Sequence, residues 1–133
     1  MVPASPGDFA ELIRQIEEQF GECQVVVHDH TPRRSILAVV CRYGAYKVRI
    51  TEIVDQAERK YRYYVLNGNV VVAGFDNAAD PRVVQKKYGR AYKKHIGELI
   101  PHLHLENKSK LELTEEMAVG RFVDWLRAHL PLT

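Results

Sequence analysis

The stretch KYRYYVLNGNVVVAGF, Lys60–Phe75, decides the fold, because it places two β-type segments around a tight-turn signal. The segments KYRYYVL and NVVVAGF are rich in aromatic and β-branched residues, which favour strands. Between them stands Asn67-Gly68, the strongest short-range hairpin signal, since both central positions of such a turn need a positive φ. We therefore predict a two-residue hairpin in which Tyr64 lies opposite Val71.

A second hairpin is predicted upstream of the first. The segments SILAVVCRY and YKVRITEIV alternate with period two on either side of Gly44-Ala45, and a two-residue turn would pair Arg42 with Lys47. With CQVVVHD at 23–29, these segments predict an antiparallel meander of four to five strands. Alternation gathers Arg42, Lys47 and Arg49 on one face, which is either a solvated sheet face or a surface for an anion.

Helices complete the predicted α+β fold. The segment 8–20 is amphipathic and predicts an N-terminal helix. Asp80-Pro81 is typical of a helix start with Asp80 as N-cap, and Gly89 should leave this second, basic helix short or broken. A C-terminal helix is predicted over Thr114–His129, with Thr114 as its N-cap. We expect the 133 residues to form one domain, 1–133.

The composition indicates an ordinary globular protein. Hydrophobic residues make up 46% of the chain and charged residues 27%. No apolar run approaches the roughly 20 residues of a membrane span, and the first residues lack the features of a signal peptide, so we expect a cytoplasmic protein with no membrane partner. Cys23 and Cys41 lack metal-ligand spacing and are expected to be buried thiols. No nucleotide-binding motif is present, and we predict no cofactor.

Basic residues are concentrated in one segment of the chain. The basic segment, Arg82–Lys94, holds six Lys and Arg and no acidic residue. Removing those six from the total of 19 leaves 13 basic residues against 17 acidic ones elsewhere. A basic segment on a mildly acidic body favours an anionic partner, with nucleic acid as the first candidate. Tyr88 lies among these cations and could stack on an unpaired base, or it could belong to the core.

Histidines supply three further candidates. If PHLHLEN is a strand, His102 and His104 project from the same face, with Glu106 at the next step, and such a set can ligate zinc or iron. A polar strand edge is the alternative. His28 and His30 have the same spacing at a strand end, which we interpret as a polar cluster near a loop.

His95 is the third candidate and follows Lys94 at the end of the basic segment. A histidine can exchange protons near neutral pH, and a lysine can stabilise the charge of a pentavalent phosphate. Metal-independent RNA cleavage by the 2′-OH needs these two kinds of group.

Several motifs of the chain resemble the TumE-like family, the proposed toxins of prokaryotic toxin–antitoxin pairs. The resemblance covers roughly residues 39–97 and has three parts. Tyr61 and Tyr63 match the family's Tyr-x-Tyr strand. Phe75 to Ala78 match its aromatic-Asp-Asn-Ala segment, and Lys94 and His95 match the end of its His-Lys-His cluster. The chain has Ala78-Ala79-Asp80-Pro81 where the family commonly has Ala-Pro-His-His-Pro, so that pair of histidines is missing, and Lys93 replaces the first His of the cluster. The helix-then-meander order is also similar to that of RelE-type ribonuclease toxins, an analogy of fold that does not determine function.

The resemblance implies a small cytoplasmic toxin with a cognate antitoxin as partner, and the basic segment adds RNA as the expected ligand, either bound or cleaved without a metal; a homodimer is left open. His95 and Lys94 would be catalytic, with Asp76 and Asn77 orienting His95 or the substrate. RNA would contact Arg49, Lys86, Lys87, Arg90, Tyr88 and Tyr63. One alternative is a non-catalytic module whose basic helix docks an acidic protein. Another is a metal-dependent enzyme that uses His102 and His104.

Overall fold

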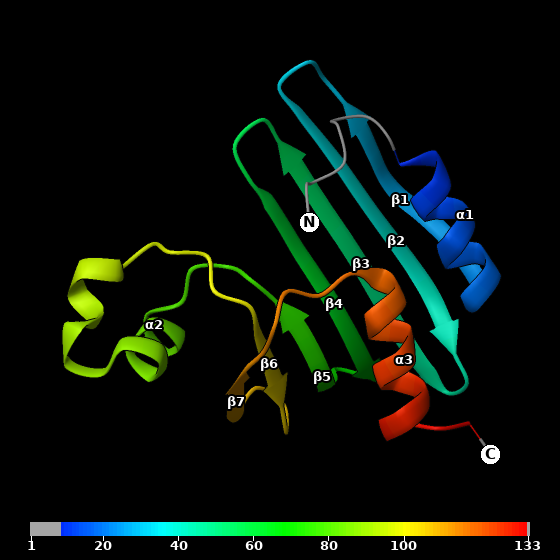
Figure 1. The fold of residues 1–133 in the computed structure, drawn as a ribbon. Coiled ribbons are helices and arrows are strands. Elements are labelled where there is room, and N and C mark those ends of the chain that lie inside the picture. The colour runs from blue at the N-terminus through cyan, green and yellow to red at the C-terminus, as the bar shows by residue number, and fades with distance from the viewer. Residues whose placement is uncertain (1–8, 133) are drawn as a thin grey trace.

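The computed structural model describes residues 9–132 and shows an α+β fold built on one antiparallel sheet (Figure 1). The seven strands lie in the sheet in chain order, so the sheet is a continuous meander. The strands are β1 (Gly21–His30), β2 (Arg34–Tyr43), β3 (Tyr46–Asp55), β4 (Arg59–Asn67), β5 (Val70–Asp76), β6 (His102–Leu105) and β7 (Lys110–Leu113). The helices are α1 (Ala10–Gln19), α2 (Pro81–Tyr88), the 3-10 helix η1 (Gly89–His95) and α3 (Val119–His129).

Two of the helices cover the same face of the sheet. Ile16 of α1 and Phe122 of α3 are fully buried against inward-facing residues of the strands, among them Ile50 and Tyr63 (Figure 1). Strand alternation sends the neighbouring side chains to the opposite face, which neither α1 nor α3 covers. We call this opposite face the open face. It carries Arg42, Lys47 and Arg49, as predicted, and Arg42 pairs with Lys47 across the hairpin.

The predicted four to five strands are too few, because the hairpin of β6 and β7 adds two. Its turn has positive φ at three successive residues, Glu106, Asn107 and Lys108, none of which is a glycine. Such a turn lacks the usual sequence signal. The side-chain oxygen of Asn107 accepts a hydrogen bond from the Val71 N–H at 3.1 Å, and the Asn107 N–H donates to the Val71 carbonyl at 2.9 Å. Contacts with a distant strand therefore hold the turn.

The hairpin of β4 and β5 forms where predicted, but its register is different. Tyr64 lies opposite Gly74 and not opposite Val71. The loop residues are 68 and 69, with φ of 59° at Gly68, and Asn67 pairs with Val70. Positive φ at the first central position is typical of a type II′ turn. The partner of Tyr64 is thus shifted by three residues, from Val71 to Gly74. The displaced turn accounts for two of these residues, and a β-bulge after Val71 accounts for the third.

The C-terminal helix begins at Val119, five residues later than predicted. The backbone around Met117 is instead held by side chains of β4. The Arg59 guanidinium donates to the Met117 carbonyl at 2.9 Å, and the Met117 N–H donates to the Tyr61 hydroxyl at 3.2 Å. These bonds occupy backbone groups that a first helical turn would use, so 114–118 stays outside the helix. The predicted N-terminal helix is present as α1, and its predicted start at Asp8 lies outside the described residues.

The basic helix has the predicted start and break. The Asp80 carboxylate accepts a hydrogen bond from the Arg82 N–H at 2.9 Å, and α2 ends at Tyr88, directly before η1 begins at Gly89. Val83, Val84 and Ile100 form a small second core that packs against Leu111 of β7. Leu111 lies opposite His104, so the two side chains share a face. The basic helix therefore sits at the β7 end of the open face. Among residues 9–132, no helix has the length and apolar character needed to cross a membrane.

Candidate functional site

The candidate site lies on the open face, where two neighbouring strands, β5 and β6, present three polar side chains. Asp76 is the last residue of β5 and lies directly opposite His102 of β6. Gly74 is two residues earlier and lies opposite His104. Because residues two apart on a strand share a face, Asp76, His102 and His104 all point to the same side. We call these three residues the Asp76–His102–His104 cluster.

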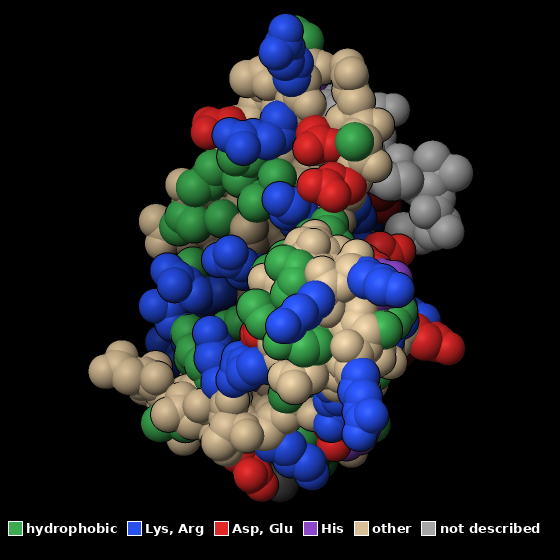
Figure 2. All heavy atoms as spheres, turned by 90° about the vertical axis from the view of Figure 1, so that its left-hand side faces the viewer, with side chains coloured by type: hydrophobic (Ala, Val, Ile, Leu, Met, Phe, Trp, Pro, Cys, Tyr) green, Lys and Arg blue, Asp and Glu red, His purple; other side chains and the backbone are tan. Residues whose placement is uncertain are grey.

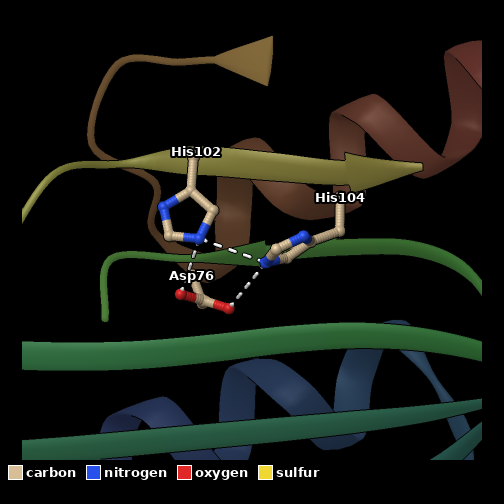
Figure 3. A group of neighbouring side chains, drawn as sticks. All are labelled: Asp76, His102 and His104. Carbon is tan, nitrogen blue, oxygen red and sulfur yellow. Dashed lines mark hydrogen bonds and ion pairs between the residues drawn. The ribbon is translucent and has the colours of Figure 1, made fainter. Parts of the chain in front are cut away.

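The reactive atoms of the cluster converge on one point (Figure 3). The Nε2 atom of His102 lies 3.0 Å from Oδ1 of Asp76, and Nε2 of His104 lies 3.5 Å from Oδ2. The two Nε2 atoms are 3.1 Å apart. All three side chains are at most 6% exposed. The sequence-based expectation placed Glu106 with the histidines, but Glu106 is an exposed turn residue and Asp76 takes that place.

Neighbouring groups hold the cluster in this geometry. Nδ1–H of His102 donates to the Ile100 carbonyl at 2.7 Å, which assigns the ring orientation. The Asp76 carboxylate accepts from the Ala78 N–H at 2.8 Å and from the Tyr64 hydroxyl at 2.9 Å. Each carboxylate oxygen therefore has one hydrogen-bond donor besides the histidines. Nδ1 of His104 is buried and has no hydrogen-bond partner among the described residues.

Gly74 makes room for Tyr64 to reach Asp76. The two residues are cross-strand partners, and a β-carbon on Gly74 would lie 2.9 Å from the Tyr64 ring. Any other residue would therefore push the ring away from its place above Gly74. The register shift of the hairpin thus has a chemical consequence, since it pairs the tyrosine with a glycine, which leaves space for the ring.

The charges of the cluster are strongly coupled. Burial alone would raise the pKa of Asp76, but hydrogen bonds with His102, Ala78 and Tyr64 lower that pKa to about 2. Burial opposes charge on His102 as well, yet the hydrogen bond with Asp76 and the Ile100 carbonyl give its pKa a net rise. The pKa of His104 is lowered by burial and then by the neighbouring His102. The cluster therefore contains a carboxylate and favours one positive charge beside it.

The cluster forms one end of a cleft on the open face, with a volume of about 660 Å³. The floor includes small and apolar side chains of β2 and β4, namely Ala38, Val40 and Leu66. Cationic side chains surround it: Arg49, Arg62, Arg82 and Lys108. Figure 2 shows a group of Lys and Arg side chains at the left of the view with few acidic ones among them, whereas acidic side chains lie mainly near the top and along the right and lower edges.

The cations of the cleft differ in what they contact. Arg82 is paired with Asp80 at 2.9 Å, and the Lys108 ammonium lies 5.0 Å from the centre of the Tyr64 ring. Arg49 and Arg62 are exposed, and within residues 9–132 neither forms an ion pair with an acidic side chain. These two guanidinium groups are therefore available to an anionic ligand.

The predicted catalytic pair lies elsewhere. His95 and Lys94 are on η1 and do not line the cleft. The His95 ring stacks on Tyr88 with the ring centres 3.6 Å apart, and its Nδ1 lies 3.1 Å from a carboxylate oxygen of Glu98. The Tyr88 hydroxyl also donates to Glu98, at 2.7 Å. The structure thus does not bring His95 together with Asp76.

Two other predicted roles do not fit the positions of the residues. Tyr63 is fully buried in the main core, where its hydroxyl hydrogen-bonds to Glu52, so it offers no surface to RNA. Asn77 is also buried, and both ends of its amide are bound to backbone. Its Oδ1 accepts from the Tyr61 N–H at 3.0 Å and its Nδ2 donates to the Arg59 carbonyl at 2.9 Å. Asn77 therefore joins the end of β5 to β4 instead of orienting His95.

The remaining predicted RNA contacts divide between two surfaces. Arg49 lines the cleft, whereas Lys86, Lys87 and Arg90 lie outside its lining, on α2 and η1. Sequence reasoning missed Arg62 and Tyr64. Alternation on β4 could have found them, because Arg62 and Tyr64 are on the opposite face from the apolar Val65 and the buried Tyr61.

Comparison with known proteins does not identify the chain. No family model, no curated protein and no solved structure matches it. The resemblance to the TumE-like family and the analogy to RelE-type toxins therefore remain predictions from the sequence.

Proposed function

We propose that the protein binds single-stranded RNA in the cleft and promotes cleavage of a phosphodiester held over the Asp76–His102–His104 cluster. The observation that carries this proposal is that the cluster and two unpaired guanidinium groups line the same cleft. Arginine forks match the geometry of phosphate oxygens, and such contacts bind a nucleic-acid backbone without reading its sequence.

The shape of the cleft favours an unpaired strand. Its floor of Ala38, Val40 and Leu66 can accept the apolar face of a base, and the half-buried Tyr64 ring adds an aromatic surface beside the cluster. Bases of a single strand are free to make such contacts, whereas those of a duplex are stacked on one another. A strand bound through Arg49 and Arg62 would then run towards the histidines.

The cluster supplies chemistry that the cationic part of the cleft lacks. Two imidazoles and a carboxylate can exchange protons with a reacting phosphodiester or can hold a cation against its charge. In either case the scissile phosphate lies beside His102 and His104, because both residues line the cleft. The expectation of metal-independent cleavage depended on His95 and Lys94, and neither residue lines the cleft.

Binding is tested by comparing two groups of variants. Arg49→Ala with Arg62→Ala should weaken binding of a single-stranded RNA and reduce the salt slope by about 0.7 per lost phosphate contact. The matched variant, Lys86→Ala with Lys87→Ala and Arg90→Ala, removes more positive charge outside the cleft and should have the smaller effect. If only this second variant loses binding, RNA lies on the basic helix and the cleft assignment is wrong.

Cleavage is tested by changing two pairs of histidines in turn, each pair two residues apart in the sequence. His102→Gln with His104→Gln should lower the cleavage rate by at least about 10²-fold, as expected when groups that act on the reacting bond are removed. The control, His28→Gln with His30→Gln, changes two exposed histidines of β1 and should leave the rate unchanged. If His95→Gln loses cleavage while the His102→Gln and His104→Gln double variant stays active, His95 is the catalytic residue, as the sequence predicted.

A second candidate function uses the basic segment. Lys86, Arg90, Lys93 and Lys94 are exposed and lie outside the cleft, so they remain free to bind an acidic protein such as a cognate antitoxin. Growth arrest on induced expression, relieved by the product of a neighbouring small reading frame, would support the toxin pair. Relief that persists in the Lys86, Lys87 and Arg90 variant would exclude the basic helix as the docking surface.

A further inference from the structure

We propose that the Asp76–His102–His104 cluster binds one divalent transition-metal ion, with Zn²⁺ as its best match, through Nε2 of both histidines and the Asp76 carboxylate. Two histidines and a carboxylate are a ligand set found for zinc and for non-haem iron. The inference goes beyond RNA binding by Arg49 and Arg62, and it holds whether or not RNA is the substrate.

The distances within the cluster fit an ion. Around a tetrahedral zinc with bonds of about 2.0–2.1 Å, neighbouring ligand atoms lie about 3.3–3.4 Å apart. Here the Nε2–Nε2 distance is 3.1 Å, and the two Nε2 atoms lie 3.0 and 3.5 Å from different oxygens of the Asp76 carboxylate. One ligand atom from each residue lies within 4.8 Å of the other two. The two nitrogens are therefore spaced nearly as an ion would hold them, and the Asp76 carboxylate would shift to present one oxygen to the ion.

A cation also resolves a conflict among these atoms. Two imidazole nitrogens and a carboxylate oxygen lie within 4.8 Å of one another at a buried site. A proton between two of these groups forms one directed hydrogen bond that joins them. The third group then has no donor and faces the lone pair of a neighbour. An ion bonds to all three at once, so it satisfies the arrangement more completely.

The surroundings of the cluster have the features of a metal site. Nδ1–H of His102 is bound to a backbone carbonyl, which leaves Nε2 as the metal-binding nitrogen. Asp76 is oriented by the Tyr64 hydroxyl and the Ala78 N–H. All three ligands are among the residues that line the cleft. Three protein ligands leave coordination positions for water or a phosphate oxygen, as catalytic sites do.

The test is metal binding by the full chain, measured without RNA. The chelator-stripped protein should bind one Zn²⁺ per chain, and Co²⁺ should give the visible absorption of a protein-bound, four- or five-coordinate ion. Mg²⁺ should not compete, because it prefers oxygen ligands. Binding should also raise the unfolding temperature, since the ion binds only the folded chain.

Variants identify the ligands. His102→Gln, His104→Gln and Asp76→Asn should each abolish the Co²⁺ signal, whereas His28→Gln with His30→Gln should retain it. Should the variants fail to fold, the parent protein still decides: no stoichiometric uptake of Zn²⁺ or Co²⁺ overturns the proposal. It is also overturned if uptake survives in the cluster variants and is lost in the His28 and His30 variant. A protein that takes up the ion but binds no RNA keeps this inference and refutes the proposed RNA function.

Discussion

Gly74 is the residue on which the geometry of the candidate site most depends. A β-carbon there would come within 2.9 Å of the Tyr64 ring, whose hydroxyl donates to Asp76. We predict that Gly74→Ala displaces the ring and destabilises the fold by about 1–3 kcal/mol, the range for overpacking. Gly120→Ala in α3 is the control and should stabilise by about 0.5–1 kcal/mol, because its β-carbon would meet only Gln15, at 3.5 Å. Urea denaturation measures both, and equal effects would contradict this role of Gly74.

Tyr64 itself acts on the cluster through Asp76. Tyr64→Phe removes the hydroxyl that donates to the Asp76 carboxylate but keeps the ring. We predict a loss of about 10–100-fold in Zn²⁺ affinity, as is common when an outer hydrogen bond to a metal ligand is removed. Competition with a chromogenic chelator measures the affinity. The matched control is Tyr46→Phe on β3, whose hydroxyl does not line the cleft and should leave the affinity unchanged.

At the scale of elements, the turn between β4 and β5 determines which residues face one another. Gly68 has φ of 59° and no atom within 4 Å of a β-carbon built on it, so only backbone strain opposes substitution. We predict that Gly68→Val destabilises by about 1 kcal/mol or more, because a β-branched residue resists positive φ. Gly21→Val on β1, where φ is not positive, should stay within about 0.5 kcal/mol. Thermal unfolding compares the two, and a neutral Gly68→Val would mean that the turn can change its conformation.

At the scale of the whole molecule, a buried ion pair connects the sheet to the segment before α3. The Arg59 guanidinium donates to Glu52 at 2.7 Å and to the Met117 carbonyl at 2.9 Å, and the Arg59 and Glu52 side chains are 8% and 4% exposed. We predict that Glu52→Gln costs about 3–5 kcal/mol, because it removes the buried carboxylate and leaves the Arg59 cation with the half-exposed Glu116, 3.7 Å away. Arg14→Gln breaks only exposed pairs on α1 and should cost less than about 1 kcal/mol. Urea denaturation compares the free energies of unfolding of the two variants. Similar losses in both would show that the buried pair of Arg59 and Glu52 is not critical for stability.

Local patterns predicted the hairpins and helices well, and the register less well. The pairing of Arg42 with Lys47 and the N-cap at Asp80 follow from neighbouring residues, so the sequence indicated both. The start of α3 was wrong, since Arg59 and Tyr61 of a distant strand bind the backbone around Met117. His102 and His104 were recognised as a strand pair, but their carboxylate was expected at Glu106. A local pattern can supply only a sequence neighbour as the third ligand.

The sequence by itself determined that the chain forms an antiparallel meander with helices, because alternation and turn chemistry act over a few residues. It also determined that one sheet face carries Arg42, Lys47 and Arg49. Only the tertiary structure decided that β5 pairs with β6, which sets Asp76 opposite His102 across an intervening helix and loop. That pairing depends on how the segment between them packs against β7, through Val83, Val84 and Ile100. Contacts between residues far apart in the chain therefore assembled the candidate site, and no local pattern in the sequence could specify them.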